Sequence, residues 1–201
     1  MRKFCMSLMM VAMMCCQLFA QQPPKTCAEA RSALDALIAM HGSLVAQRAH
    51  YTATLSTIHA RINAIDAELR YEIWGDGFGD CQECQDLKQD LEGQLEGLYQ
   101  SYNAMLPWTQ SSDNALLNQN LVASGIQAME NDLAFNPGDT TICTAVYYGA
   151  TGWAYTLAGD VMDIYLDRIV QTNALLDSAD DLLDAAIEGC ECSGGGEGDP
   201  E

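Results

Sequence analysis

The apolar positions from Thr26 to Trp74 recur at alternating spacings of three and four residues. A repeat sustained over about six heptads is typical of a long helix that packs lengthwise against other helices. At about 1.5 Å per residue, this helix would be on the order of 70 Å long. It cannot bury its apolar stripe alone, so we expect the rest of the chain to supply helices of similar length. The stripe consists of Cys27, Ala30, Leu34, Leu37, His41, Leu44, Arg48, Tyr51, Leu55, Ile58, Ile62, Ile65 and Leu69.

A second helical stretch follows the glycine-rich segment 75–79 and extends to about Phe135. Asp80 followed by Glu83 is a capping-box pattern, which predicts that this helix begins there, as Thr26 and Glu29 predict for the first helix. Pro107 interrupts the stretch, because a proline inside a helix removes a hydrogen bond and crowds the preceding turn. The apolar stripe is Cys84, Leu87, Leu91, Leu95, Leu98, Tyr102 and Met105. New caps after the break are offered by Ser111, Ser112 and Asp113.

A third helical stretch runs from about Ile142 to Glu188, where Gly189 is expected to stop it. The segment 136–139 before it is a turn by its chemistry, since Pro137 fixes one torsion and the glycine after it frees the next. Candidate caps for this helix are Thr140 and Thr141. The expected apolar positions are Cys143, Val146, Ala150, Trp153, Leu157, Val161, Ile169, Leu176, Leu183 and Ile187.

Three helical stretches of similar length joined by short turns predict an all-α fold, an elongated up-down-up bundle of three long helices with coiled-coil-like packing. In this fold the second helix is kinked near Pro107. A four-helix bundle, with the chain reversing at Pro107, is the alternative, but it would leave halves of the long helices without partners. No stretch shows sustained two-residue alternation, so we expect almost no strand.

Residues 1–20 have the layout of a secretory signal peptide, with Arg2 and Lys3 before an apolar run that is too short for a confident membrane span. Cleavage would leave a helical bundle domain at 21–192 and an acidic, glycine-rich tail at 193–201 that we expect to be disordered. Six of the nine cysteines would remain, and an even number in an exported protein predicts disulfides. We therefore expect a secreted or periplasmic location.

The predicted topology suggests how these cysteines pair. The first and third helices begin at one end of the bundle with one cysteine each, and the other four cysteines lie where the second helix begins and the third ends. A disulfide between Cys27 and Cys143 would close a loop of more than a hundred residues, which on the chain-entropy model adds about 4 to 5 kcal/mol to the free energy of unfolding. Disulfides at both ends are therefore expected, with Cys27 bonded to Cys143 and the other four cysteines paired among themselves. Cys84 and Cys190 each lie one step further inside their helices, so the pairs predicted among these four are Cys84–Cys190 and Cys81–Cys192.

The four cysteines at the second end allow two other interpretations. The spacing of Cys81 and Cys84 is that of a redox motif, but it follows a helix instead of a strand, and the nearby acids Asp80, Glu83 and Asp86 would oppose a reactive thiolate. Together with the Cys-x-Cys pair near the C-terminus, the motif could instead form a four-cysteine zinc site. Structural disulfides remain the main expectation because of the predicted export.

Other candidate ligands favour structural explanations. His41, His50 and His59 are each nine residues apart, so successive rings point to opposite sides of a helix and cannot share a metal ion. The segment 76–80 lacks the oxygen ligand and the glycine that a calcium loop needs. Two acidic faces on the third helix, which we interpret as solvated surface, are formed by Asp160, Asp163 and Asp167 and by Asp177, Asp180, Asp181 and Asp184.

The segment 141–159 has no charged residue and contains four aromatic residues among three glycines. One interpretation is a closely packed helix in which the glycines admit neighbouring side chains. The other is a patch that contacts a partner or a membrane, since aromatic residues are enriched at both kinds of interface.

Charge and motifs together limit the function. Without residues 1–20 the chain has seven basic and 28 acidic residues, a net charge of −21, so nucleic acid and anionic membranes are poor partners. No pattern indicates a catalytic, cofactor or metal site strongly enough to expect an enzyme. We expect an exported structural or interaction protein, a scaffold or spacer whose protein partner is unidentified. The alternatives are a membrane-active protein that inserts the segment 141–159 and a four-cysteine zinc or redox protein.

Overall fold

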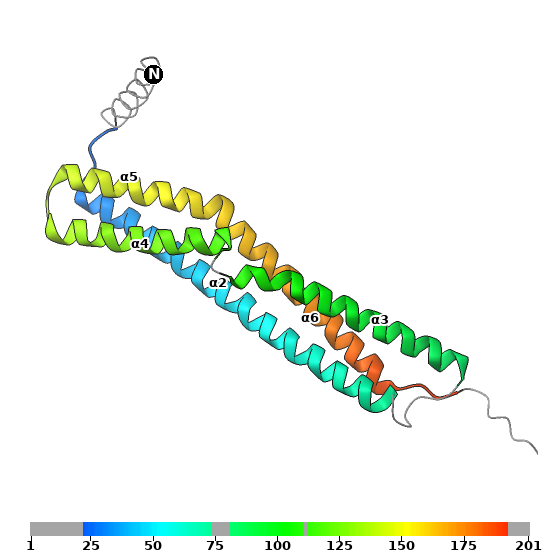
Figure 1. The fold of residues 1–201 in the computed structure, drawn as a ribbon. Coiled ribbons are helices and arrows are strands. Elements are labelled where there is room, and N and C mark those ends of the chain that lie inside the picture. The colour runs from blue at the N-terminus through cyan, green and yellow to red at the C-terminus, as the bar shows by residue number, and fades with distance from the viewer. Residues whose placement is uncertain (1–21, 74–80, 111, 193–201) are drawn as a thin grey trace, which may run out of the picture. The chain divides into compact units, whose positions relative to one another are not determined.

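The computed structural model describes residues 22–73, 81–110 and 112–192, and nearly all of them are helical. The predicted signal peptide, the predicted turn at 74–80 with Asp80, and the C-terminal tail lie outside the described residues. No strand element occurs within the described ranges, in agreement with the prediction. The α-helices are α2 (Cys27–Glu68), α3 (Gln82–Met105), α4 (Asn114–Phe135), α5 (Thr140–Thr156) and α6 (Met162–Glu188) (Figure 1).

Short irregular helical turns connect several of these α-helices. A π-helical turn, Leu69–Ile73, extends α2, and another, Leu157–Val161, joins α5 to α6 without a break. A 3₁₀ turn, Leu106–Thr109, follows α3, and the backbone of Gln110 beyond it is extended. The interruption predicted at Pro107 is therefore confirmed, and it separates α3 from α4.

The described chain divides into two compact units. Unit 1 holds residues 22–39 and 124–154, and unit 2 holds residues 40–73, 81–110, 112–123 and 155–192. Both units contain segments that are far apart in sequence, and α2 and α4 each contribute to both. Each unit also has its own disulfide crosslinks, described below.

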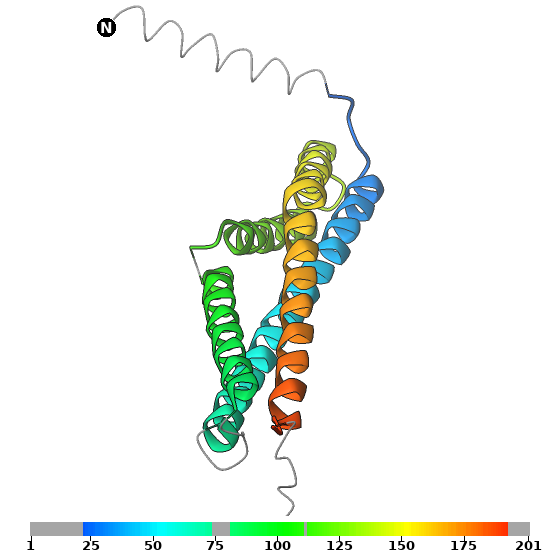
Figure 2. The same cartoon turned by 90° about the vertical axis from the view of Figure 1, so that its right-hand side faces the viewer.

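The contacts within unit 2 establish the direction of each helix. The second leg of the chain, α3 with the start of α4, meets α2 at steadily lower numbers: Tyr99 lies at Asn63, Tyr102 at His59, Trp108 at Tyr51 and Gln119 at His41. This order continues past Pro107, so the chain does not reverse there and the four-helix alternative is wrong. α6 runs parallel to α2, because Tyr165 stacks on Tyr51 and Asp180 pairs with Arg61. Figures 1 and 2 show α3, α6 and the second half of α2 alongside one another.

The predicted stripe of the first helix forms the core side of α2. Ten of its thirteen positions are buried, and the other three, Cys27, His41 and Arg48, are half-buried. The capping box at its start is also confirmed: the Glu29 amide donates to Thr26 Oγ1 at 3.2 Å, and the Thr26 amide donates to Glu29 Oε2 at 2.9 Å. The stripe of α3 agrees equally well, since its predicted members are all buried or half-buried.

Beyond Val161, the apolar stripe predicted for the third leg is offset by one position from the most deeply buried residues, and it is wrong at Ile187. Three of the large apolar residues expected in the core, Ile169, Leu176 and Leu183, are half-buried, and Ile187 is 59% exposed. Each lies one position after a residue that faces the core. The reason is that several core-facing positions of α6, such as Arg168, Thr172 and Ala186, carry polar or small residues, which hydrophobicity alone does not mark. The core-facing residues of α6 are Tyr165, Arg168, Thr172, Leu175, Ala179, Leu182 and Ala186.

The helix ends agree with the turn chemistry, with one correction at the start of α5. Gly138 and Gly189 have φ values of 91° and 68°, which is the left-handed region that favours glycine. α5 is capped by Asp139 and not by a threonine, since the carboxylate accepts the Thr141 amide at 2.8 Å. Among the described side chains none caps α3, whose N-cap residue is Cys81.

Candidate functional site

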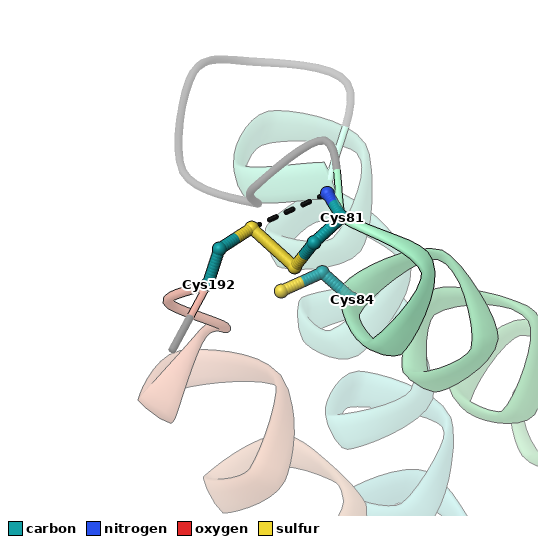
Figure 3. A group of neighbouring side chains, drawn as sticks. All are labelled: Cys81, Cys84 and Cys192. Atoms are coloured by element: carbon teal, nitrogen blue, oxygen red, sulfur yellow. Dashed lines mark hydrogen bonds between the residues drawn. A yellow bond between two sulfur atoms is a disulfide. The ribbon is translucent and has the colours of Figure 1, made fainter. Parts of the chain in front are cut away.

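Four cysteines of unit 2 gather where α3 begins and α6 ends. Cys81 is the N-cap residue of α3 and Cys84 lies in its first turn, whereas Cys190 and Cys192 follow Gly189 at the end of α6. Disulfides join Cys84 to Cys190, with an S–S distance of 2.00 Å, and Cys81 to Cys192. Both pairs agree with the prediction, and Figure 3 shows the Cys81–Cys192 bond.

The sulfur atoms of the two disulfides are close neighbours. The Sγ atoms of Cys81, Cys84 and Cys192 all lie within 4.8 Å of one another, and Figure 3 shows the Cys84 sulfur pointing toward the Cys81–Cys192 bond. The Cys81 amide also donates a hydrogen bond to Cys192 Sγ at 3.2 Å. Cys84 is buried, Cys81 and Cys190 are half-buried, and Cys192 is exposed. Within the described residues, this is the group of potential ligands close enough together to share a metal ion.

The Cys81-x-x-Cys84 motif does not form an internal disulfide. Both of its cysteines are bonded to the C-terminal segment, so the crosslinks connect α3 to α6 across more than a hundred residues of chain, with sequence separations of 111 and 106. In the disulfide-bonded form these sulfurs have a structural role, because they fix the start of α3 to the end of α6.

Unit 1 has one disulfide, and it joins the starts of two helices. Cys27 in the first turn of α2 is bonded to Cys143 in the first turn of α5, with a Cα–Cα distance of 4.8 Å. The residues just before α2 contact α5 as well: the Lys25 amide donates to Thr144 Oγ1 at 2.8 Å, and the Lys25 ammonium lies 4.6 Å from the centre of the Tyr147 ring. The third predicted pair is therefore also present.

A second cluster of functional groups, which the sequence did not reveal, surrounds the break between α3 and α4. We call it the polar core cluster. It lies in unit 2, and its members come from α2, the 3₁₀ turn, the start of α4 and α6. The members are Tyr51, Trp108, Asp113, Gln119, Tyr165 and Arg168.

The ion pair between Arg168 and Asp113 is the centre of the polar core cluster. Two parallel hydrogen bonds of 3.0 and 2.7 Å join the guanidinium to the carboxylate, and both side chains are only about a tenth exposed, at 11% and 10%. Burial alone would raise the pKa of Asp113, but hydrogen bonds from Arg168 and from the Leu116 amide outweigh it and lower the pKa below its ordinary value. Asp113 also caps α4 through that amide, which confirms one of the three predicted caps.

Aromatic rings enclose this ion pair. The Arg168 guanidinium lies 5.1 Å from the Trp108 ring centre and 5.7 Å from the Tyr165 ring centre. Tyr165 donates to Gln119 Oε1 at 2.7 Å, and Tyr51 donates to the Trp108 carbonyl at 2.7 Å. Burial raises the pKa of Tyr165 to about 12, so the phenol is protonated at neutral pH. The cluster satisfies its own polar groups and connects the broken second leg to both neighbouring helices.

The other candidate ligands do not converge. His41 is half-buried and its Nε2 lies 3.1 Å from the Gln119 carbonyl, which requires the proton on that nitrogen, whereas His50 is exposed and His59 stacks on Tyr102. The aspartates of α6 and of the π-helical turn before it lie on the surface, and Asp180 pairs with Arg61 at 3.0 Å. These positions support the structural explanations given to both sets.

The segment 141–159 packs closely in its first half. In unit 1 the Trp153 ring fits against Gly125, where an added Cβ would lie 3.2 Å from Nε1, and Gly149 faces the sulfur of Met129. Of the three glycines in the segment, Gly149 thus admits a neighbouring side chain, as one interpretation expects, whereas a Cβ added at Gly152 or Gly159 would meet open space. In unit 2, Tyr155 is 85% exposed. None of the helices in the described ranges has both the length and the apolar character needed to cross a bilayer.

Comparisons with known proteins do not point to a function. The chain matches no family model, no curated protein and no solved structure.

Proposed function

We propose that this protein is an exported scaffold or spacer that acts by binding another protein along its helices. Three disulfides are compatible with an extracellular or otherwise oxidising compartment. The buried carboxylate, guanidinium and phenol groups of the polar core cluster bind other residues of the same cluster. These features support a protein whose core is specialised for holding helices together and whose outer faces are available for contacts.

The observation that carries the proposal is an exposed, largely apolar face of α2 within unit 2. This α2 face is uncharged except at its edge and forms a shallow depression of about 510 Å³. Small side chains on a helix allow another helix to approach closely, and contiguous apolar surface is typical of interaction sites. The lining residues are Val45, Arg48, Ala49, Thr52, Ala53 and Ser56.

Arg48 at the edge of the α2 face suggests the chemistry of the partner. Its side chain is half-buried, and none of the hydrogen bonds or ion pairs found among the described residues involves it. The chain has a large excess of acidic residues, yet this guanidinium has no carboxylate partner within the ranges that the structure describes. A partner helix that places a carboxylate among small apolar side chains would complement this face in shape and charge.

Site-specific photocrosslinking in the producing cells tests the proposal. A photoreactive residue at Ala53, in the α2 face, is expected to give one dominant crosslinked species that mass spectrometry can identify. The matched control is Ala104, an exposed alanine of α3 that does not line the α2 face, and it is expected to give little. Equal crosslinking from both positions, or none from Ala53 while the protein is found outside the cytoplasm, would contradict a contact through this face.

A second candidate function is insertion of the segment 141–159 into a membrane. It is favoured by the absence of charge in that segment and by the exposed ring of Tyr155. Release of a trapped dye from liposomes at neutral and acidic pH would support it, with Tyr155→Ser reducing the release. Intact liposomes at every pH would eliminate it.

A further inference from the structure

We propose that, after reduction, the thiolates of Cys81, Cys84, Cys190 and Cys192 bind one zinc ion in a tetrahedral four-sulfur site. The same four residues would then crosslink α3 to α6 in two ways, through two disulfides under oxidising conditions and through a metal under reducing conditions. This inference goes beyond the proposed scaffold function and does not depend on it.

The positions of the sulfur atoms fit such a site. In a tetrahedral zinc–thiolate centre the bonds are about 2.3 Å, which places the sulfur atoms about 3.8 Å apart. Here three Sγ atoms already lie within 4.8 Å of one another, and the fourth, that of Cys190, is bonded to Cys84 Sγ. Reduction has to separate each bonded pair and to bring the Cys190 sulfur, which lies outside the 4.8 Å group, closer to the other two. Cys190 follows Gly189 beyond the end of α6, so this adjustment falls on the segment after the helix.

The backbone around the cluster favours bound thiolates. Cys81 and Cys84 lie at the N-terminus of α3, where the helix dipole stabilises negative charge. The Cys81 amide already donates to Cys192 Sγ, a bond that would become stronger with a charged sulfur. Gly189, with its φ of 68°, ends α6 and allows the following cysteines to turn toward α3.

The conversion of the two disulfides into a zinc–thiolate site balances when a dithiol is the reductant. Each of two dithiol molecules transfers two electrons and two protons to one disulfide and leaves as a cyclic disulfide, so the protein gains four thiols. Zinc binding then releases four protons and forms four Zn–S bonds, which leaves a centre with a net charge of −2. Zinc does not change its oxidation state in these steps.

The Cys27–Cys143 pair of unit 1 provides an internal control. It offers two sulfur atoms, and no further cysteine within the described residues lies near it. A variant with Cys27→Ser and Cys143→Ser retains the four proposed ligands. The complementary variant, with Cys81→Ser and Cys192→Ser, has lost two of them.

Cobalt titration of the reduced protein tests the site. The purified chain is reduced with a dithiol, freed of it under nitrogen, and titrated with Co²⁺, whose visible absorption reports tetrahedral thiolate coordination. The Cys27→Ser/Cys143→Ser variant is expected to bind one equivalent, to release it to Zn²⁺, and to gain thermal stability with Zn²⁺ by circular dichroism. The Cys81→Ser/Cys192→Ser variant is expected to lose the tetrahedral spectrum and to bind at least tenfold more weakly.

Three results would overturn the proposal. The first is no Co²⁺ binding by the reduced Cys27→Ser/Cys143→Ser variant, whether or not it stays helical. The second is equal binding by the two variants. The third is binding of unchanged strength in urea, because a site assembled from α3 and α6 requires the folded chain.

Discussion

The two units secure their helix ends in different ways. In unit 1, α2 begins with a capping box and α5 with the Asp139 cap, and a single disulfide joins these two capped ends. In unit 2, α3 begins at Cys81 without a side-chain cap among the described residues, and two disulfides connect this end to α6. Unit 2 also has a local cap, since Asp113 caps the start of α4, but the start of α3 is joined to α6 by two covalent bonds between segments far apart in sequence.

The two units also differ in the contacts that hold their interiors together. Unit 1 is held by close contacts of small and large residues, such as Gly125 with Trp153. Unit 2 contains the polar core cluster, whose ion pair joins residues that are 55 positions apart. We expect unit 2 to be the more sensitive to the loss of single long-range bonds.

The largest effect is expected from the disulfides. Removing the Cys84–Cys190 and Cys81–Cys192 bonds with four serines should lower the free energy of unfolding by about 5 kcal/mol for the first crosslink and about 2 kcal/mol for the second, since the first already holds the ends of the second together. Removing Cys27–Cys143 should cost about 5 kcal/mol at most. Urea unfolding of both variants measures this, and a greater loss from the unit 1 variant would contradict the comparison.

Breaking the buried ion pair should have the next largest effect. Asp113→Asn leaves the guanidinium of Arg168 buried without its carboxylate, which should cost about 3 to 5 kcal/mol in urea unfolding. Adding Arg168→Met should recover part of this loss, because no unpaired charge then remains. The exposed pair of Arg61 and Asp180 is the control, and Asp180→Asn should change stability by less than about 1 kcal/mol.

A smaller change is expected where glycine admits a large ring. Gly125→Ala in unit 1 brings a methyl group to 3.2 Å from Trp153 Nε1, and overpacking should outweigh the gain in helix propensity, for a net loss of about 1 kcal/mol. Gly97→Ala in α3 places its Cβ in open space and should stabilise the protein by up to about 1 kcal/mol. Thermal unfolding of both variants would show the opposite signs.

The smallest effect concerns the capping box of unit 1. Hydrogen bonds from the backbone and side chain of Thr26, and from Lys25, lower the pKa of Glu29 to about 2, from an ordinary value of 4.5. Because the folded-state pKa is the lower one, this stabilisation is complete above pH 4.5 and is lost as the pH falls toward 2. Glu29→Gln should therefore be less stable than the natural chain at pH 7, and the difference should disappear near pH 2 in urea unfolding.

The sequence alone determined the helices and, through their topology, the disulfides. The apolar repeat of α2 is a local property, since each residue in the stripe follows from helical geometry, and every predicted position is buried or half-buried. Matched helix lengths then placed the cysteines at common ends, which was sufficient to predict Cys27–Cys143, and the depth of each cysteine within its helix predicted the other two pairs. The turn at Gly138 and the stop at Gly189 follow from glycine's access to positive φ.

Tertiary structure decided which polar residues belong to the core. Arg168 and Tyr165 lie in the stripe of α6, but only their contacts with Asp113 and Gln119 distinguish them from surface residues, and these partners come from another leg of the chain. Two signals were present in the sequence: Arg168 is the lone basic residue after Lys88, and Tyr165 lies four positions after Val161. Neither signal names a partner, because hydrophobic periodicity fixes the side of a helix that is buried, whereas the pairing of buried polar groups depends on which helices meet there.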